Sequence, residues 1–212
     1  MSGPILILGA TSGIGAAALK EAQSRGVPAR AFARGADKLD ATELVEPFPG
    51  DALSSDDVKK ALAGTRAVIY ALGIKERLSM LWEEETLFSE TTRVLLPAMS
   101  EASVTRLVVV TGFGAGRSKS AMSSIERLGH RAVLGRPYAD KDRQEALIMD
   151  SALDWTIVRP VILTNGSATP PTVLRDPKTW RNGLVSRSAV ATYLLDAIED
   201  DLDIRADVVL AR

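Results

Sequence analysis

Residues 5–15, which read ILILGATSGIG, decide the fold of this chain. Four consecutive aliphatic residues predict a strand that is buried on both faces of a sheet, because such strands lack alternation of apolar and polar positions. The glycine-rich turn leads into a helical pattern at 14–25, which Gly26 ends. Residues 5–25 therefore predict a strand, a tight turn and a helix, which together open a βαβ unit.

The turn predicts a site for a pyrophosphate group. At the carboxyl end of a strand, its backbone N–H groups and the positive end of the helix dipole converge on one point. Gly9 permits the tight turn, Gly13 the close approach of a phosphate, and Gly15 the close packing of helix on strand. A plain strand-to-helix turn is the alternative, but the position in a βαβ unit favours a nucleotide site. The predicted contacts are Gly9, Thr11, Ser12, Gly13, Ile14 and Gly15, with hydroxyl donors from Thr11 and Ser12.

Outward from this turn, short aliphatic runs alternate with amphipathic stretches along the whole chain. The predicted strands are 5–8, 29–33, 45–48, 67–72, 107–111, 155–158 and 208–210, and the predicted helices are 14–25, 54–63, 86–103, 138–151 and 188–199. Pro97 is expected to bend the third helix, and Pro47 with Pro49 places the third strand at a sheet edge. The alternation predicts a single-domain α/β fold, a Rossmann doubly wound parallel sheet spanning 1–212.

The residues that follow the second, third and fourth strands predict how a dinucleotide would bind. Arg34 stands where an acid would accept the ribose hydroxyls of NAD and where an arginine would meet the 2′-phosphate of NADP. Guanidinium pairs bidentately with phosphate, so NADP(H) is favoured over NAD(H), with Lys38 as a second positive charge nearby. A solvated surface arginine is the alternative for Arg34.

Two further segments are predicted to contact the cofactor. Asp51 and Ala52 would meet the adenine edge, although an aspartate that only starts a helix is an equal alternative. Ala71, Leu72 and Gly73 end the fourth strand, where small residues let a cofactor lie against the backbone. An ordinary strand end is the alternative for these three.

With these residues in place, nearly the whole chain resembles the atypical short-chain dehydrogenase/reductases, in particular the NAD(P)H-binding group of NmrA-like and biliverdin/flavin reductase B-like proteins. The further blocks that carry the resemblance are VTG at 110–112, YADK at 138–141 with Glu145, and DWTIVRP at 154–160. The resemblance implies that Thr111 and Gly112 contact the cofactor and that Lys141 hydrogen-bonds the nicotinamide ribose. It also implies that the backbone after Pro160 meets the carboxamide.

One departure from the classical enzymes of this superfamily affects the chemistry. Those enzymes use a serine, a tyrosine and a lysine four residues after the tyrosine to protonate a carbonyl. Here Asp142 stands four residues after Tyr138, and the lysine, Lys141, stands three after it. Both spacings put a lysine on the face of the helix that carries the tyrosine, so Tyr138 remains a candidate proton donor. Its alternative role is packing at the start of the helix.

Composition excludes several kinds of site and partner. The 212 residues include no cysteine and one histidine, so no metal site is expected, and His130 is given no role. A net charge of -1 gives no reason to expect nucleic acid or a membrane as a partner. The sequence shows no signal peptide and no apolar run of the roughly 18–20 residues that span a bilayer. A soluble, cytoplasmic protein is predicted, and its oligomeric state stays open.

Three long segments, at about 74–90, 112–137 and 160–183, are expected to form loops around a small-molecule substrate. Trp82, Phe88 and Phe113 either form an apolar platform for a planar aromatic acceptor or pack in the core. The second segment is basic, which suits either an acidic substrate or a solvated loop; its residues of this kind are Arg117, Lys119, Arg127, Arg131 and Arg136.

Together these features predict an NADP(H)-dependent oxidoreductase that transfers hydride to a flavin, a quinone, a tetrapyrrole or a small carbonyl compound. The main alternative is a non-catalytic NADP(H)-binding redox sensor of the NmrA-like type, which the incomplete triad equally suits. An epimerase or dehydratase is a third reading, but the chain after Pro160 is short for a sugar-nucleotide site.

Overall fold

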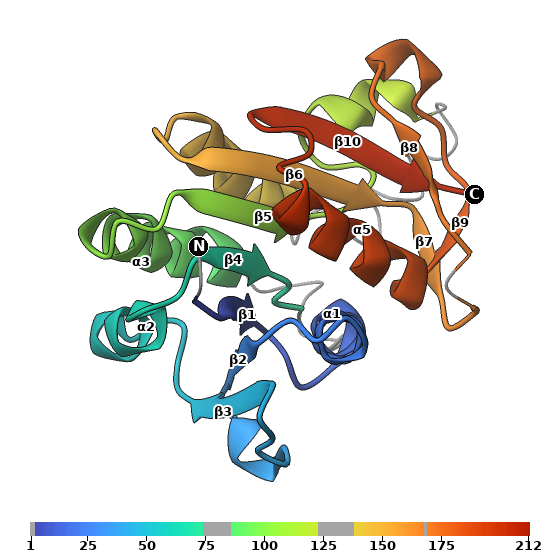
Figure 1. The fold of residues 1–212 in the computed structure, drawn as a ribbon. Coiled ribbons are helices and arrows are strands. Elements are labelled where there is room, and N and C mark those ends of the chain that lie inside the picture. The colour runs from blue at the N-terminus through green and yellow to red at the C-terminus, as the bar shows by residue number, and fades with distance from the viewer. Residues whose placement is uncertain (1–2, 74–85, 123–137, 168) are drawn as a thin grey trace.

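An eight-stranded sheet organises the computed structural model, in the order β3-β2-β1-β4-β5-β6-β10-β8 (Figure 1). The structure describes residues 3–73, 86–122, 138–167 and 169–212. The strands of this sheet are β1 (Ile5–Leu8), β2 (Ala29–Ala33), β3 (Val45–Pro49), β4 (Ala67–Tyr70), β5 (Arg106–Val110), β6 (Asp154–Pro160), β8 (Thr172–Leu174) and β10 (Ala206–Ala211). Neighbours are parallel, except that β8 is antiparallel to β10. The predicted Rossmann fold in a single domain is confirmed.

Helices cover both faces of this sheet. One face carries α1 (Gly13–Ser24) and α5 (Arg187–Glu199), which lie side by side, and the other carries α2 (Ser55–Leu62), α3 (Leu87–Glu101) and a helix at 138–149 (Figure 1). The side chains of β1 alternate between the two cores, since Ile5 and Ile7 join one cluster while Leu6 and Leu8 join the other. Burial on both faces explains why β1 shows no polar alternation.

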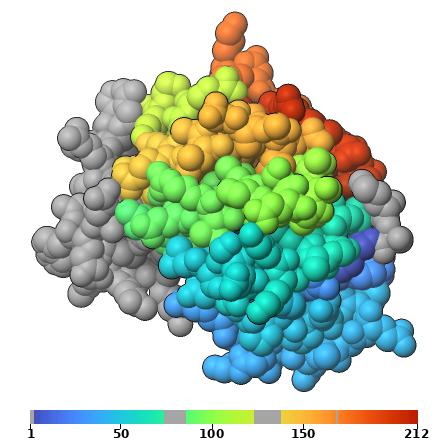
Figure 2. Space-filling model, turned by 90° about the vertical axis from the view of Figure 1, so that its left-hand side faces the viewer, coloured from blue at the N-terminus to red at the C-terminus, as the bar shows by residue number. Residues whose placement is uncertain are grey.

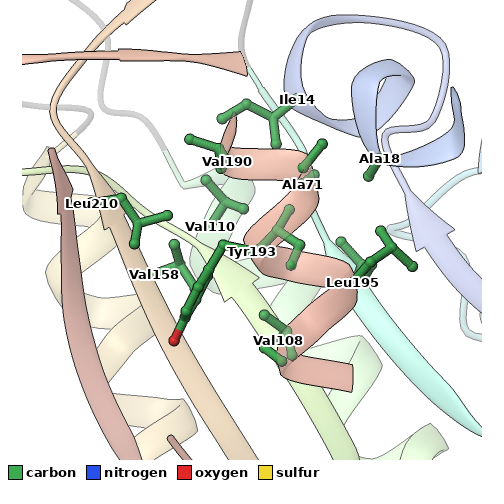
Figure 3. Close-up of a cluster of buried hydrophobic side chains, with 14 of the residues drawn as sticks. Ile14, Ala18, Ala71, Val108, Val110, Val158, Val190, Tyr193, Leu195 and Leu210 are labelled. Carbon is green, nitrogen blue, oxygen red and sulfur yellow. The ribbon is translucent and has the colours of Figure 1, made fainter. Parts of the chain in front are cut away.

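The core under α5 joins the first and last parts of the chain. Figure 3 shows α5 beside α1 on one face of the sheet, with Val190 near Ile14 and with Val110 and Val158 on the strands. Ala18 presents only a methyl group and is fully buried, so the α5 backbone approaches α1 closely. This packing fixes the start of α1 against the strands.

Most of the predicted boundaries agree with the structure to within two residues. Ser54 caps α2 by accepting a hydrogen bond from the Asp57 N–H, and Gly26, with φ +71, ends α1 as predicted. The helix α3 continues through Pro97. The edge position predicted for the proline-containing third strand is confirmed. In Figure 2 the colours run across one side of the molecule from blue and cyan, through green, to orange and red, which is close to the order of the segments along the chain.

The segment 160–183 is not a plain loop as expected. It contains β7 (Ile162–Thr164), β8 and the short 3-10 helix η4 (Pro177–Thr179), and β7 pairs in parallel with β9 (Leu184–Ser186). Three-residue strands are too short to show a period in the sequence. Two other 3-10 turns are η1 (Ala36–Lys38) and η3 (Gly116–Ala121). Within the described residues, no helix has the length and apolar content needed to cross a membrane.

Candidate functional site

The glycine turn between β1 and α1 has backbone packing that side chains would prevent. Gly9 has φ +84, and a Cβ atom there would lie 2.6 Å from the Ala71 carbonyl oxygen. A Cβ atom on Gly15 would lie 2.2 Å from the Gly9 carbonyl oxygen, so the helix starts in direct contact with the turn. Both glycines therefore have the structural positions that their predicted roles require.

The third glycine differs because it faces open space. Gly13 has φ +56, is exposed, and a Cβ atom there would meet nothing within 4 Å. Ser12 makes no side-chain capping bond to α1, and Thr11 and Ser12 are both exposed, whereas Ile14 is buried. The N-terminus of α1 thus presents N–H groups and the positive end of the helix dipole at an open glycine, an arrangement that fits a pyrophosphate.

The ends of β2 and β4 flank this turn, because both strands pair with β1. Arg34 and Lys38 are exposed, and within the described residues neither side chain forms a hydrogen bond or an ion pair, although the Lys38 backbone N–H donates to the Gly35 carbonyl. β4 ends at Tyr70, two residues earlier than predicted, and is followed by buried Ala71, half-buried Leu72 and exposed Gly73. Ala71 is the residue against which Gly9 packs, so the β4 end forms one wall of the turn.

Asp51 takes part in the loop before α2. Its Oδ1 accepts a hydrogen bond from the Leu53 N–H at 3.0 Å, and its own N–H donates to Oδ2 of Asp57 at 3.0 Å. Ala52 is buried in the core rather than exposed. Asp51 is therefore bonded to the first turn of α2, although Ser54 rather than Asp51 caps that helix. A contact of Asp51 with adenine stays a prediction.

At the end of β5, Thr111 is held by three bonds within the protein. Its N–H donates to the Val158 carbonyl at 2.9 Å, its hydroxyl donates to Oε1 of Glu145 at 2.7 Å, and its carbonyl accepts from Nζ of Lys141. The hydroxyl is thus engaged in the interior. Gly112 follows, and a Cβ atom there would lie 2.7 Å from the Tyr138 hydroxyl. The glycine makes room for the tyrosine.

Lys141 is held between two aromatic rings and a carbonyl oxygen. Its Nζ lies 5.1 Å from the ring centre of Phe88 and 5.2 Å from that of Tyr138, within the range of cation–π attraction. Burial lowers the pKa of Lys141 to about 8, against the opposing effect of the Glu145 carboxylate. Burial raises the pKa of Tyr138. The lysine therefore contacts the face of the tyrosine ring without producing an acidic phenol.

A buried ion network that sequence reasoning missed lies beside Lys141. Nε and Nη2 of Arg159 donate to the two oxygens of Glu145 at 3.0 and 2.7 Å, and its Nη1 donates to Asp207. Arg159 is fully buried, and Asp207 also binds Arg117. Burial opposes the charge of Arg159, but Glu145 and Asp207 raise its pKa above the usual value. Glu145 and Arg159 stand in the blocks quoted for the resemblance, although sequence alone assigned them no role.

The same network contacts the start of the segment 112–137 and the end of the segment 160–183. The guanidinium carbon atoms of Arg117 and Arg159 lie 5.6 and 5.2 Å from the ring of Trp180. A Cβ atom on Gly116 would lie 2.0 Å from Oε2 of Glu145, so η3 packs directly against this carboxylate. The start of the segment 112–137 and the end of the segment 160–183 therefore meet over one set of buried charges.

Two aspartates next to Lys141 serve as anchors. Asp142, at the position of the classical lysine, accepts from the Gly116 N–H at 2.7 Å and pairs with Lys119. Fully buried Asp140 caps α3 by accepting from the N–H groups of Phe88 at 2.8 Å and of Ser89 at 3.3 Å. Both contacts fix the chain on either side of the lysine.

The backbone after Pro160 is already paired with the protein. The Val161 N–H donates to the Leu210 carbonyl, the Ile162 N–H donates to the Gly183 carbonyl, and the Pro160 carbonyl accepts from the Phe113 N–H. A nicotinamide carboxamide would therefore not find a free N–H at 161 or 162. A contact between the carboxamide and the backbone at Pro160 stays a prediction, but it cannot use the N–H groups of residues 161 and 162 as they are bonded here.

For several other residues the sequence left alternatives open, and the structure places those that it describes. Phe88 and Phe113 are both buried, in the cores on opposite faces of the sheet, so they form no common platform. Arg117 and Lys119 are engaged in ion pairs. Trp82, His130 and Arg127, Arg131 and Arg136 lie outside the described residues. Among the residues that are described, no group of three or more histidine or acidic side chains is placed to hold a metal ion.

Comparison with known proteins agrees with the fold and with the glycine turn. A model of a family described as NAD(P)H-binding matches residues 9–201, and this chain belongs to that NAD(P)H-binding family. The resemblance to an NAD(P)H-binding family is thereby confirmed. A comparison with curated proteins finds no match.

Three solved structures illustrate the likeness. ChuY, described as an anaerobillin reductase from Escherichia coli O157:H7, is 25% identical with TM-score 0.80 over 98% of this chain and 96% of its own. A short-chain dehydrogenase/reductase from Veillonella parvula in complex with NADP is 17% identical with TM-score 0.83, over 100% and 95%. A putative exported protein from Burkholderia pseudomallei is 24% identical with TM-score 0.73, over 99% and 100%. The last two show a common fold alone.

Proposed function

We propose that this protein is an oxidoreductase that binds NADP(H) in preference to NAD(H) and transfers hydride to a small, planar acceptor. The observation that carries the proposal is the open Gly13 at the start of α1, where Ser12 provides no side-chain cap and backbone N–H groups are left for an anion. When bound there, the nicotinamide supplies the hydride chemistry. The protein's residues supply binding and orientation.

The preference for NADP(H) follows from charge at the end of β2. The side chains of Arg34 and Lys38 are exposed and have no partner among the described residues, so both are available to a phosphate on the adenosine ribose. The Veillonella relative was solved with NADP, which supports this choice. Thr11, Ser12, Ala71, Leu72 and Gly73 would line the rest of the dinucleotide.

The acceptor is inferred from what the site lacks. The Thr111 hydroxyl is turned into the protein, and burial raises the pKa of Tyr138, so neither of these two described hydroxyls is an easily ionised acid beside Lys141. A conjugated ring such as a flavin, a quinone or a linear tetrapyrrole accepts hydride with less need of a positioned acid than an isolated carbonyl does. The description of ChuY as an anaerobillin reductase supports a tetrapyrrole.

The same observation favours a second candidate, a redox sensor that binds NADP(H) without turnover. If the hydroxyls of Thr111 and Tyr138 serve the protein's own structure and donate no proton, a bound dinucleotide would change the protein's interactions rather than react. The absence of cysteine from the whole sequence suits a reducing compartment, and we place either activity in the cytoplasm.

One experiment separates these functions. NADPH and NADH are titrated by calorimetry, and oxidation of the preferred cofactor is then followed with flavins, quinones, linear tetrapyrroles and small carbonyl compounds in turn. Turnover with a conjugated acceptor is the expected result. Tight NADPH binding with no oxidation by any acceptor would favour the sensor. A lack of binding of either dinucleotide would refute both.

A further inference from the structure

The buried charges beside Lys141 are more than the fold requires. Burying an ion pair costs several kcal/mol per ion before its partners compensate, and well-packed apolar side chains of similar size often stabilise a protein as well. Yet Arg159, with 0% exposure, and Glu145, with 2%, form a two-bond pair at the centre of the molecule. Such a pair is retained where a fixed position or a fixed charge is needed.

One carboxylate, that of Glu145, bonds to the residue whose carbonyl accepts from Lys141. Glu145 lies four residues after Lys141 on the same helix, and therefore on the same face. Its Oε1 accepts from the Thr111 hydroxyl at 2.7 Å, and the carbonyl of Thr111 accepts from Lys141. Glu145 thus fixes the strand end to which the lysine is bonded, while Arg159 fixes Glu145.

We propose that Glu145 and Arg159 form a positioning pair that keeps Lys141 in place as an ammonium ion, ready to contact a bound cofactor. The inference rests on the proposed function for the identity of the ligand that Lys141 meets. The pair touches no cofactor itself. It acts through the lysine, and Asp207 completes it by binding the remaining side of Arg159.

Among the described residues, the groups around Lys141 leave Glu145 as the charge that favours its ammonium form. From its own helix come the Tyr138 ring and Glu145, from α3 the Phe88 ring, and from β5 the Thr111 carbonyl. The neighbouring Asp140 is turned to the N–H groups of α3. Burial favours the neutral amine of Lys141, and the Glu145 carboxylate opposes it by favouring the ammonium form.

The test measures Lys141 directly in the cofactor-free protein. The Cε resonance of Lys141, assigned with Lys141→Arg, is followed by NMR from pH 6 to pH 11 in the unaltered protein and in Glu145→Gln. The midpoint is expected near the pKa of about 8 in the first and about one unit lower in the second. With the lysine as an ammonium donor, NADPH affinity of Glu145→Gln should fall about fivefold at pH 8 and much less at pH 6.

A second variant keeps the test decisive if Glu145→Gln folds poorly. Glu145→Gln/Arg159→Met removes both charges together, leaves Asp207 with Arg117, and should unfold closer to the temperature of the unaltered protein than Glu145→Gln does. Its Lys141 midpoint and its pH 8 affinity should nevertheless stay lowered. A merely structural pair would instead let this variant regain the original midpoint, which would overturn the inference.

Arg106→Met is the matched control. Arg106 is a buried arginine at the amino end of β5, opposite the carboxyl end near Lys141, and it donates to the Ala197 and Leu202 carbonyls. Its loss should lower stability without moving the Lys141 midpoint, and an equal movement would contradict the proposal. If the unaltered protein failed to bind NADPH, the proposed function would fail, but the NMR midpoints would still decide the role of Glu145.

Discussion

Two regions at the carboxyl ends of the strands differ in whether backbone or side chains form them. The β1–α1 turn consists of backbone brought close together by glycines, with exposed hydroxyls and open space at Gly13. The end of β5 and β6 consists of side chains, where Lys141 lies between two rings and the Glu145–Arg159 pair fills the interior. The first region presents unused donors to a ligand, whereas in the second most polar groups already have partners.

The difference teaches how each region can be damaged. Adding atoms should disable the glycine turn, because its function depends on space that side chains would occupy. Removing atoms should disable the second region, because its buried groups depend on one another for hydrogen bonds and charge. The predictions below use this contrast.

The largest effect is expected from Gly13→Val. The new side chain enters the space through which phosphates would reach the α1 N–H groups, so NADPH affinity should fall by more than about 100-fold, the scale of about 2.7 kcal/mol. Calorimetry measures the affinity, and circular dichroism checks the fold. Gly26→Val is the control, because Gly26 has φ +71 with nothing within 4 Å and lies at the other end of α1. Equal losses of binding in both variants would contradict the site.

A smaller effect is expected from Arg34→Ala. The ratio of NADPH to NADH affinity should fall roughly 10- to 100-fold, since a charged hydrogen bond contributes about 1.5–3 kcal/mol. NADH affinity should change little, and this serves as the internal reference. Lys38→Ala should reduce the same ratio by less. Equal affinities for both dinucleotides in the unaltered protein would refute the assignment of Arg34.

The pH dependence should single out Lys141. Its pKa in the folded protein, about 8, lies below the ordinary value of 10.5, so the folded state loses this proton before the unfolded state does. NADPH affinity should therefore fall as pH rises above 8, by up to about tenfold per unit. Over the same interval up to 10.5, the contribution of this group to stability should rise, because the cost of its buried charge disappears. Lys141→Met should bind more weakly, with a flat profile.

The smallest effect is expected from Tyr138→Phe. A general acid usually contributes about 10²–10⁴-fold to turnover, but burial raises the pKa of this phenol and the lysine meets its ring face. With a conjugated acceptor, the rate should fall less than about tenfold, and NADPH affinity should be unchanged. A loss above 100-fold in turnover alone would show that Tyr138 donates the proton and that carbonyl reduction is the reaction.

The two regions also differ in how far sequence alone could predict them. The doubly wound sheet, the tight packing at Gly9 and Gly15 and the edge position of β3 followed from local patterns, since burial on both faces and the loss of N–H groups at prolines leave direct traces in the sequence. The cap at Ser54 and the end of α1 at Gly26 were readable for the same reason. These features depend on neighbours in the chain.

The second region depends on residues far apart in the chain. Arg159, Glu145 and Asp207 come from three elements, and no local pattern states that their charges meet. For Phe88 and Phe113 the sequence left a common platform and core packing open, and the structure shows core packing on opposite faces of the sheet. The engagement of the Val161 and Ile162 N–H groups likewise depends on contacts with Leu210 and Gly183. Pairing of this kind becomes visible only in three dimensions.

The prolines of β3 have a consequence for how this protein behaves at high concentration. The Gly50 N–H donates inward to the Ala33 carbonyl, so by alternation Pro47 and Pro49 occupy positions that face away from β2. The outer rim of the sheet therefore offers no amide hydrogen at either position to a strand from another molecule. Rims of this kind resist the stacking of chains into aggregates. Replacing both prolines would expose the protein to self-association through this edge.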